Sequence, residues 1–165
     1  MNGCWQKADS RWAGVRAKIL GIASAEIGVR EATGNNDGER VEEYLRYTGL
    51  GKGHEWCAAF VSWCYGRAGL PQPKNPWSPA LFPANRTYRL MTRPPTNGQV
   101  KRPAAADVFG VYGAHAKRIN HVGLVKKLEG NYVVTIEGNV NNRVLSKRRH
   151  LSTLYALADW VGDSE

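Results

Sequence analysis

The fold is decided by the stretch Trp56-Cys57-Ala58-Ala59-Phe60-Val61-Ser62-Trp63-Cys64-Tyr65-Gly66-Arg67-Ala68-Gly69. Drawn as a helix, this stretch is apolar nearly all the way round, which is typical of a helix in the middle of a domain. Gly69 and Pro71 end it, since glycine suits a helix terminus and proline cannot continue a helix. We therefore predict a buried helix that begins near Cys57.

Two further helices are expected before this one. The run Val15–Val29 has a broad apolar face with helical spacing, and glycines mark its end. Asn36 and Glu39 have the spacing of a capping box, which predicts a second, short helix. These residues belong to the cluster Asn35-Asn36-Asp37-Gly38-Glu39, which could also suggest a calcium-binding loop. The cluster lacks the full ligand set of such a loop, so a helix cap is the preferred interpretation.

All eight prolines lie between positions 71 and 103. Such a segment cannot supply central strands, so we predict a long ordered loop with one turn of helix after Ser78-Pro79. Loops of this length are usually functional, which makes this one a candidate wall of a groove lined by Trp77, Phe82 and Tyr88. The alternative is that these aromatic side chains only pin the loop to the core.

After Asp107 the pattern changes to strands, with a hairpin turn at Glu129-Gly130-Asn131. Helices followed by an antiparallel meander indicate an α+β domain. The expected strands are Val108–Tyr112, His121–Leu128, Tyr132–Ile136, Arg143–Leu151 and Tyr155–Trp160.

The chain has 165 residues, 42% of them hydrophobic and 22% charged, and a formal net charge of +9. These values fit one soluble domain and exclude a disordered, collagen-like or coiled-coil chain. No stretch approaches the ~20 apolar residues of a membrane span, and the first residues lack the features of a signal peptide. The positive charge favours an anionic polymer as partner, although a solvated basic face explains it too. Affinity for such a polymer is expected to depend on the basic residues Arg143, Lys147, Arg148 and Arg149.

The three cysteines, an odd number, argue against a disulfide framework. On one helix, the spacing of Cys57 and Cys64 separates their Cα atoms by about 10 Å, which is too far for a bridge. Free backbone N–H groups and the helix dipole lower the pKa of a thiol at a helix start. Cys57 is therefore the candidate nucleophile, and Cys64 is assigned to the core.

A base for this thiol is expected on the hairpin. If Glu129-Gly130-Asn131 is a three-residue loop, the residue numbers of each facing pair on the two strands add up to 260. His121 then lies opposite Asn139, and Glu137 lies one diagonal step away on the same face. A two-residue loop places His121 and Glu137 on opposite faces, so the interpretation requires an odd-length loop or a bulge. A histidine oriented by a carboxylate or amide can take the proton of a thiol, as nucleophilic acyl transfer requires. Cys57 and His121 should then face each other between the helix and the sheet.

Three motifs occur in order: Glu55-Trp56-Cys57-Ala58-Ala59-Phe60-Val61-Ser62-Trp63-Cys64, His121-Val122-Gly123-Leu124-Val125 and Thr135-Ile136-Glu137-Gly138-Asn139. Together they resemble the CHAP family of bacterial cell-wall amidohydrolases, most strongly its small, phage-associated branch. The resemblance implies a papain-like, NlpC-related fold over a single domain of residues 1–165. Its core covers about 19–160, and 71–103 is the proline-rich loop. In this fold N-terminal helices precede an antiparallel sheet, and the catalytic cysteine opens a buried helix that packs on it.

The resemblance also implies that Cys57 attacks a peptidoglycan amide, that His121 is the base, and that Glu137 with Asn139 orients the histidine. The bond that is cleaved is either the amide between N-acetylmuramic acid and L-alanine or an amide of the peptide stem. Candidate substrate-binding residues are His54 and Trp56 beside the cysteine, and Trp77 and Tyr88 in the loop.

A zinc site drawn from His54, His115 and His121 lacks paired ligand motifs, so no metal or other cofactor is expected. The expected partner is bacterial peptidoglycan, on which the protein should act as a monomer in the cell envelope. An immunity or inhibitor protein is a further candidate partner, and no nucleic acid is expected. Two alternatives remain: a non-catalytic basic module that binds an anionic polymer, and a papain-like protease acting on proteins.

Overall fold

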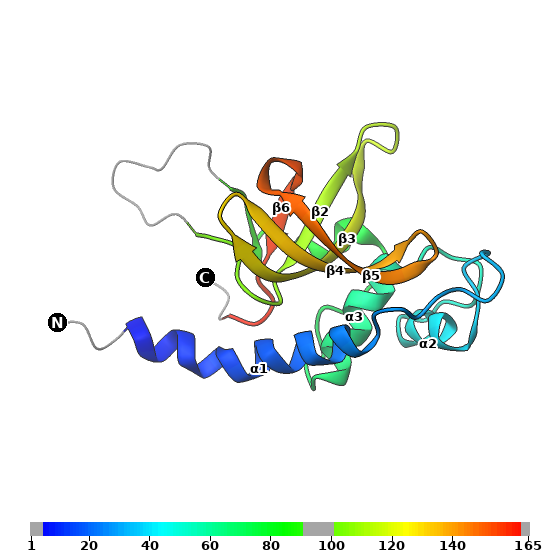
Figure 1. Ribbon diagram of the computed structural model, residues 1–165, viewed down its shortest axis with the longest axis horizontal. Helices are drawn as coiled ribbons and strands as arrows, with labels where there is room; N and C mark the ends of the chain where they lie inside the picture. The colour runs from blue at the N-terminus through cyan, green and yellow to red at the C-terminus, as the bar shows by residue number, and fades with distance from the viewer. Residues whose placement is uncertain (1–4, 91–100, 163–165) are drawn as a thin grey trace.

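The structure is a computed structural model that describes residues 5–90 and 101–162. Within these ranges three α-helices precede a six-stranded antiparallel sheet (Figure 1), which confirms the α+β class. No helix in the described chain is long and apolar enough to cross a membrane. The helices are α1 (Trp5–Ala25), α2 (Glu39–Tyr47) and α3 (Cys57–Arg67).

The strands lie in the order β1-β6-β2-β3-β4-β5, and every neighbouring pair is antiparallel. Strands β2 to β5 form consecutive hairpins, but β6 returns to pair with β2, so the sheet departs from a simple meander. The described part of the proline-rich segment supplies the short helix η1 and the edge strand β1, where missing N–H donors do least harm. The bounds are η1 (Ser78–Leu81), β1 (Thr87–Tyr88), β2 (Val108–Gly113), β3 (Arg118–Glu129), β4 (Tyr132–Val140), β5 (Arg143–His150), η2 (Leu151–Thr153) and β6 (Ala156–Ala158).

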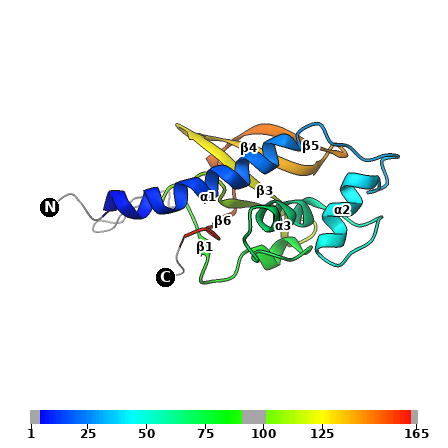
Figure 2. The same ribbon diagram turned by 90° about the horizontal axis from the view of Figure 1, so that it is seen from below.

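Helix α3 is the central helix of the fold, as its apolar sequence predicts. Every side chain from Cys57 to Tyr65 is buried. The helix contacts α1 and α2 as well as strands β3 and β4, and Figures 1 and 2 show it against the sheet with α1 running beside it. Its first residue, Cys57, interacts with His121 and Val122 of β3.

Helix α1 ends at Ala25, before the expected terminus at Val29. Gly28 has φ of 100°, a left-handed conformation that suits glycine and ends the helical path. Its N–H donates to the carbonyl of Val144 at 3.0 Å, so the chain leaves the helix and runs along β5.

Helix α2 confirms the expected second helix but not its expected cap. Its N-cap is Gly38, and Glu39 is already the first helical residue. The N–H of Asn36 donates to the carboxylate of Glu31 at 3.0 Å, so Asn36 belongs to the preceding loop.

The β3–β4 hairpin differs from the prediction at its turn and agrees with it further along. Glu129 pairs with Tyr132, so the loop has two residues instead of three. A β-bulge at Lys126 then shifts the register by one residue, and Leu124 pairs with Ile136. Beyond the bulge, facing positions therefore sum to 260, which is the register that the candidate site requires.

Candidate active site

Cys57 is the first residue of α3 and is only 4% exposed. At this position its backbone N–H has no acceptor within the helix. Burial raises the pKa of the Cys57 thiol, but a hydrogen bond and the charge of His121, together with a hydrogen bond to Ser78, outweigh it and leave the pKa lowered. Burial raises the pKa of Cys64, which lies inside the helix. Of these two thiols, Cys57 is therefore the one disposed to ionise.

His121 lies on β3 between the thiol and a carboxylate. Its Nε2 is 2.7 Å from Oε2 of Glu137, which leaves Nδ1 for Cys57. Burial lowers the pKa of His121, but hydrogen bonds and charges from Cys57 and Glu137 outweigh this and raise it to about 9. The geometry therefore favours a thiolate beside an imidazolium.

Glu137 is fully buried on β4 and its carboxylate is held by three residues. Besides His121, it accepts from Oγ1 of Thr135 at 2.6 Å, and from Nε and Nη2 of Arg149 at 2.6 and 2.8 Å. Burial raises the pKa of Glu137, but the hydrogen bonds from Arg149, His121 and Thr135 outweigh it and lower the pKa to about 2. The carboxylate is thus ionised and fixed in place.

Arg149 corrects one expectation from the sequence. It was assigned to a basic surface region, but its side chain is only 18% exposed and both of its bonds go to Glu137. Strand alternation is the signal that could have found it: Thr135 pairs with Lys147 on β5, so Arg149 is on the same face as Glu137. Sequence reasoning also missed Ser78, whose Oγ lies 3.5 Å from Sγ of Cys57.

A cavity of about 320 Å³ opens beside Cys57. Trp77 and His54 line it, as predicted, and Trp77 is 56% exposed. In the described part of the chain, no three His, Cys, Asp or Glu side chains are grouped so as to hold a metal ion. The remaining lining residues are Leu50, Glu55, Pro76, Ser78 and Arg118.

Several predicted residues lie outside this cavity. Trp56 is fully buried and its Nε1 donates to Glu31 at 2.8 Å, so it is a core residue and not a substrate contact. Tyr88 donates its hydroxyl to the carboxylate of Asp107, which anchors β1, and it does not line the cavity. Phe82 packs against the main core.

Asn139 lies close in sequence to Glu137 but is not bonded to the histidine. It has φ of 60° in a β-bulge of β4, where the pairing with β5 is interrupted. No hydrogen bond joins its side chain to His121 within the described residues. Its part in orienting the histidine stays a prediction.

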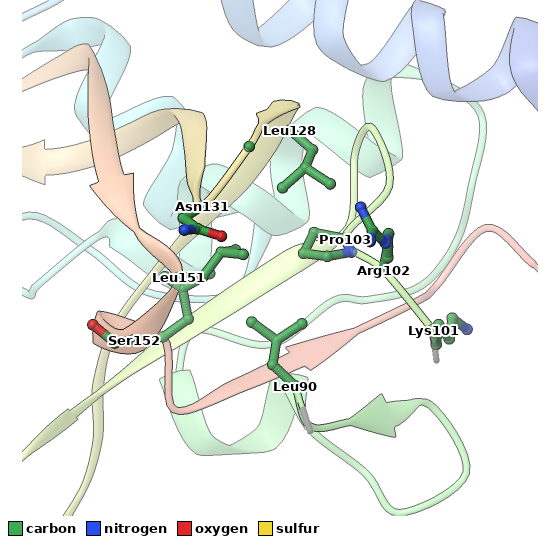
Figure 3. A pocket seen from close by; sticks show the side chains of 10 residues that line it. Leu90, Lys101, Arg102, Pro103, Leu128, Asn131, Leu151 and Ser152 are labelled. Atoms are coloured by element: carbon green, nitrogen blue, oxygen red, sulfur yellow. The ribbon is translucent and has the colours of Figure 1, made fainter. Parts of the chain in front are cut away.

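A larger cavity, of about 450 Å³, lies at the turn end of the β3–β4 hairpin (Figure 3). Leucine side chains, including Leu90, Leu128 and Leu151, line it together with Lys101 and Arg102. None of the predicted site residues borders this cavity. The chemistry-bearing residues therefore single out the smaller cavity.

Residues 49–139, more than half of the chain, match the family model of the CHAP domain. This range includes Cys57, His121, Glu137 and Asn139. Comparison with the curated proteins gave no match.

Solved structures of similar fold include three proteins at 14% identity. The peptidoglycan hydrolase RipB from Mycobacterium tuberculosis has a TM-score of 0.54, with coverage of 93% of this chain and 68% of RipB. The P60 domain of an antigen from M. avium paratuberculosis has a TM-score of 0.50, with coverage of 89% and 93% respectively. The resuscitation promoting factor interacting protein RipA, in a form mutated at one histidine, has a TM-score of 0.54, with coverage of 92% and 64%. These likenesses confirm the predicted papain-like fold.

Proposed function

Because this chain belongs to the CHAP domain family, we propose that it is a cysteine-dependent hydrolase that cleaves an amide bond of bacterial peptidoglycan. The observation that carries the proposal is the position of His121, which interacts with the Cys57 thiol and lies 2.7 Å from Glu137. The similar structure RipB is named a peptidoglycan hydrolase, which supports the same substrate class. The net charge of +9 suits an anionic wall.

In the first half-reaction, the Cys57 thiolate attacks the carbonyl carbon of the amide and forms a carbon–sulfur bond. The carbonyl oxygen becomes an oxyanion, and the free backbone N–H of Cys57 at the start of α3 donates to it. The His121 imidazolium then gives its proton to the amide nitrogen, the carbon–nitrogen bond breaks, and the amine leaves. A thioester and a neutral histidine remain.

In the second half-reaction, neutral His121 takes a proton from a water molecule, whose oxygen attacks the thioester carbon. The carbon–sulfur bond breaks, a carboxylic acid fragment is released, and the thiolate–imidazolium pair is restored. Ser78, with its hydroxyl 3.5 Å from the sulfur, is placed to donate to the departing thiolate.

The proposed role of Glu137 is to fix the ring of His121 and to stabilise its positive charge. Arg149 and Thr135 together hold both carboxylate oxygens, so Glu137 can neither rotate away nor readily accept a proton. Arg149 is in this account a positioning residue that acts through Glu137. Asn139 is retained as a candidate second orienting group.

Both amide classes of peptidoglycan fit this chemistry: the bond between N-acetylmuramic acid and L-alanine, and the bonds of the peptide stem. We assign substrate contacts to Trp77 and His54, which border the cavity beside Cys57. An exposed indole offers a flat apolar face for a sugar ring or a peptide. Since peptidoglycan lies in the bacterial envelope, that is where the chain is proposed to act.

The test is to incubate purified peptidoglycan with the wild type, Cys57→Ala and, as a matched control, Cys64→Ala. Mass spectrometry of the released fragments should show products for the wild type and the control, and none for Cys57→Ala with an unchanged circular dichroism spectrum. A new amine on L-alanine identifies an amidase, and a new amine within the stem identifies an endopeptidase. Binding of sacculi without any cleavage would replace the enzyme with a binding module, and cleavage of proteins alone would indicate a protease.

A further inference from the structure

Arg30 and Arg143 lie side by side at the edge of the sheet. After α1 the chain runs antiparallel to the start of β5, where the two arginines pair in an isolated β-bridge. Figure 1 shows the course of the chain from α1 past β5. The residues that flank the two arginines exchange backbone hydrogen bonds of 2.8 and 2.9 Å, so the arginines themselves form a non-hydrogen-bonded pair. Opposed side chains approach most closely in such a pair, and like charges there repel each other.

Neither arginine has an acidic partner within the described residues, and Nε of Arg143 is buried without an acceptor. The carboxylate of Glu31 lies with the two arginines in the wall of one cavity. Its oxygens accept from Nε1 of Trp56 at 2.8 Å and from the N–H of Asn36 at 3.0 Å. Both donors are neutral, so Glu31 keeps its negative charge in the cavity wall, but among the described residues it forms no ion pair with either arginine.

The cavity beside the two arginines has a volume of about 400 Å³. Asn141 and Asn142, at the turn between β4 and β5, also line it. Their side-chain amides make no hydrogen bonds within the described chain and can donate. Thr33 and Gly34 complete the wall, and the hydroxyl of Thr33 already donates to Asp37 at 2.6 Å.

We propose that this cavity binds an oxyanion, a phosphate or a carboxylate, through Arg30 and Arg143. Planar guanidinium groups match the geometry of both anions with paired hydrogen bonds, and an anion between two of them removes their repulsion. The source of the anion rests on the proposed function: it is a phosphate of a wall polymer or a carboxylate of the peptide stem.

The basic residues on β5 were expected to contribute together to the affinity for an anionic polymer, and this site assigns that contribution to Arg143. Arg149 is bound to Glu137, and Arg148 lies over the ring of Tyr132 at 3.7 Å and pairs with a glutamate at 3.4 Å. Arg143 has no such partner within the described residues and shares a cavity with a second cation. Glu31, in the wall of this cavity, also accepts a hydrogen bond from Trp56, the residue that precedes Cys57.

The first experiment titrates inorganic phosphate into the full chain at constant ionic strength, with chloride as the control anion. Phosphate should raise the Tm of the wild type and shift the Nε–H resonance of Arg143 in a saturable manner, and chloride should do neither. Arg30→Gln should lose both responses, and Arg143→Gln, which has no such Nε–H group, should lose the rise in Tm. Arg148→Gln, the matched control, should keep them.

A second signature separates a binding site from a structural role. Without phosphate and at low salt, Arg30→Gln should have a higher Tm than the wild type, because it removes one of two repelling charges. Equal phosphate responses in the wild type and both variants, or a loss in Arg148→Gln as well, would overturn the proposal. So would a lower Tm of Arg30→Gln in phosphate-free buffer.

The source of the anion is tested on sacculi with and without their phosphate polymers. If the anion is a phosphate of the wall polymer, Arg143→Gln should be retained several-fold less than the wild type on untreated sacculi only. If it is a carboxylate of the peptide stem, Arg143→Gln should be retained less on both kinds of sacculi. The phosphate titration uses no substrate, so its failure leaves the proposed function intact. Failure of peptidoglycan cleavage in turn leaves the anion site testable.

Discussion

Replacing Glu137 with glutamine separates the charge of the carboxylate from its shape. Glutamine keeps an oxygen that can accept a hydrogen bond from His121, but it carries no negative charge. In the wild type the pKa of His121 is raised from 6.5 to about 9, with Cys57 and Glu137 as the two anions that raise it. This shift corresponds to about 3 kcal/mol of stabilisation of the imidazolium.

If the two anions contribute about equally, loss of one lowers the pKa of His121 by about one unit. The uncompensated charge of Arg149 acts in the same direction, since a nearby cation disfavours an imidazolium. The alkaline limb of kcat/KM marks the loss of the imidazolium proton, so in Glu137→Gln this limb should move to lower pH by about one unit or more.

The assay is the cleavage of a soluble muropeptide from about pH 5 to about pH 10, a range that spans the alkaline limb of the wild type and of the variant. Glu129→Gln is the matched control, because Glu129 lies on the same hairpin but is partly exposed and pairs with Lys127. An alkaline limb at the same pH in Glu137→Gln and the wild type would show that the charge of Glu137 does not raise the pKa of His121. An equal shift in Glu129→Gln would show that the effect is not specific to Glu137.

Three further results are expected. Alkylation at neutral pH should modify Cys57 faster than Cys64, whose pKa is raised, and faster labelling of Cys64 would contradict the assignment of the nucleophile. Arg149→Gln should lower kcat at least about tenfold with little change in KM, whereas Arg149→Lys, which keeps the charge and one donor, should recover part of the loss; equal loss in both variants would argue against a positioning role. Because the pKa of Glu137 is lowered from 4.5 to about 2, its contribution to stability is complete above pH 4.5 and is lost as the pH falls toward 2. The free energy of unfolding should therefore fall by about 3 kcal/mol more over this interval in the wild type than in Glu137→Gln, as urea denaturation can measure.

Local patterns were sufficient to predict much of the fold. The apolar run after Trp56 predicted α3 and its burial, because a helix without a polar face must be covered on all sides. Strand alternation placed His121 and Glu137 on one face once a bulge was allowed. The position of the bulge at Lys126 has no local signal, since neither glycine nor proline marks it.

Contacts between distant residues account for what the sequence did not reveal. The indole of Trp56 looks like a groove residue beside Cys57, but its partner Glu31 lies 25 positions away and draws it into the core. Arg149 looks like a surface charge, and only the pairing of β4 with β5 brings it to Glu137. Buried ion pairs of this kind depend on tertiary register, which composition and periodicity do not specify.

Trapping the acyl-enzyme identifies which cysteine is the nucleophile, and we expect Cys57. Wild type mixed with a soluble muropeptide and quenched in acid should carry the acyl fragment on the peptide that contains Cys57, with Cys64 unmodified. Cys57→Ala should give neither the adduct nor products. Release of products by Cys57→Ala, or an adduct on Cys64, would contradict the account.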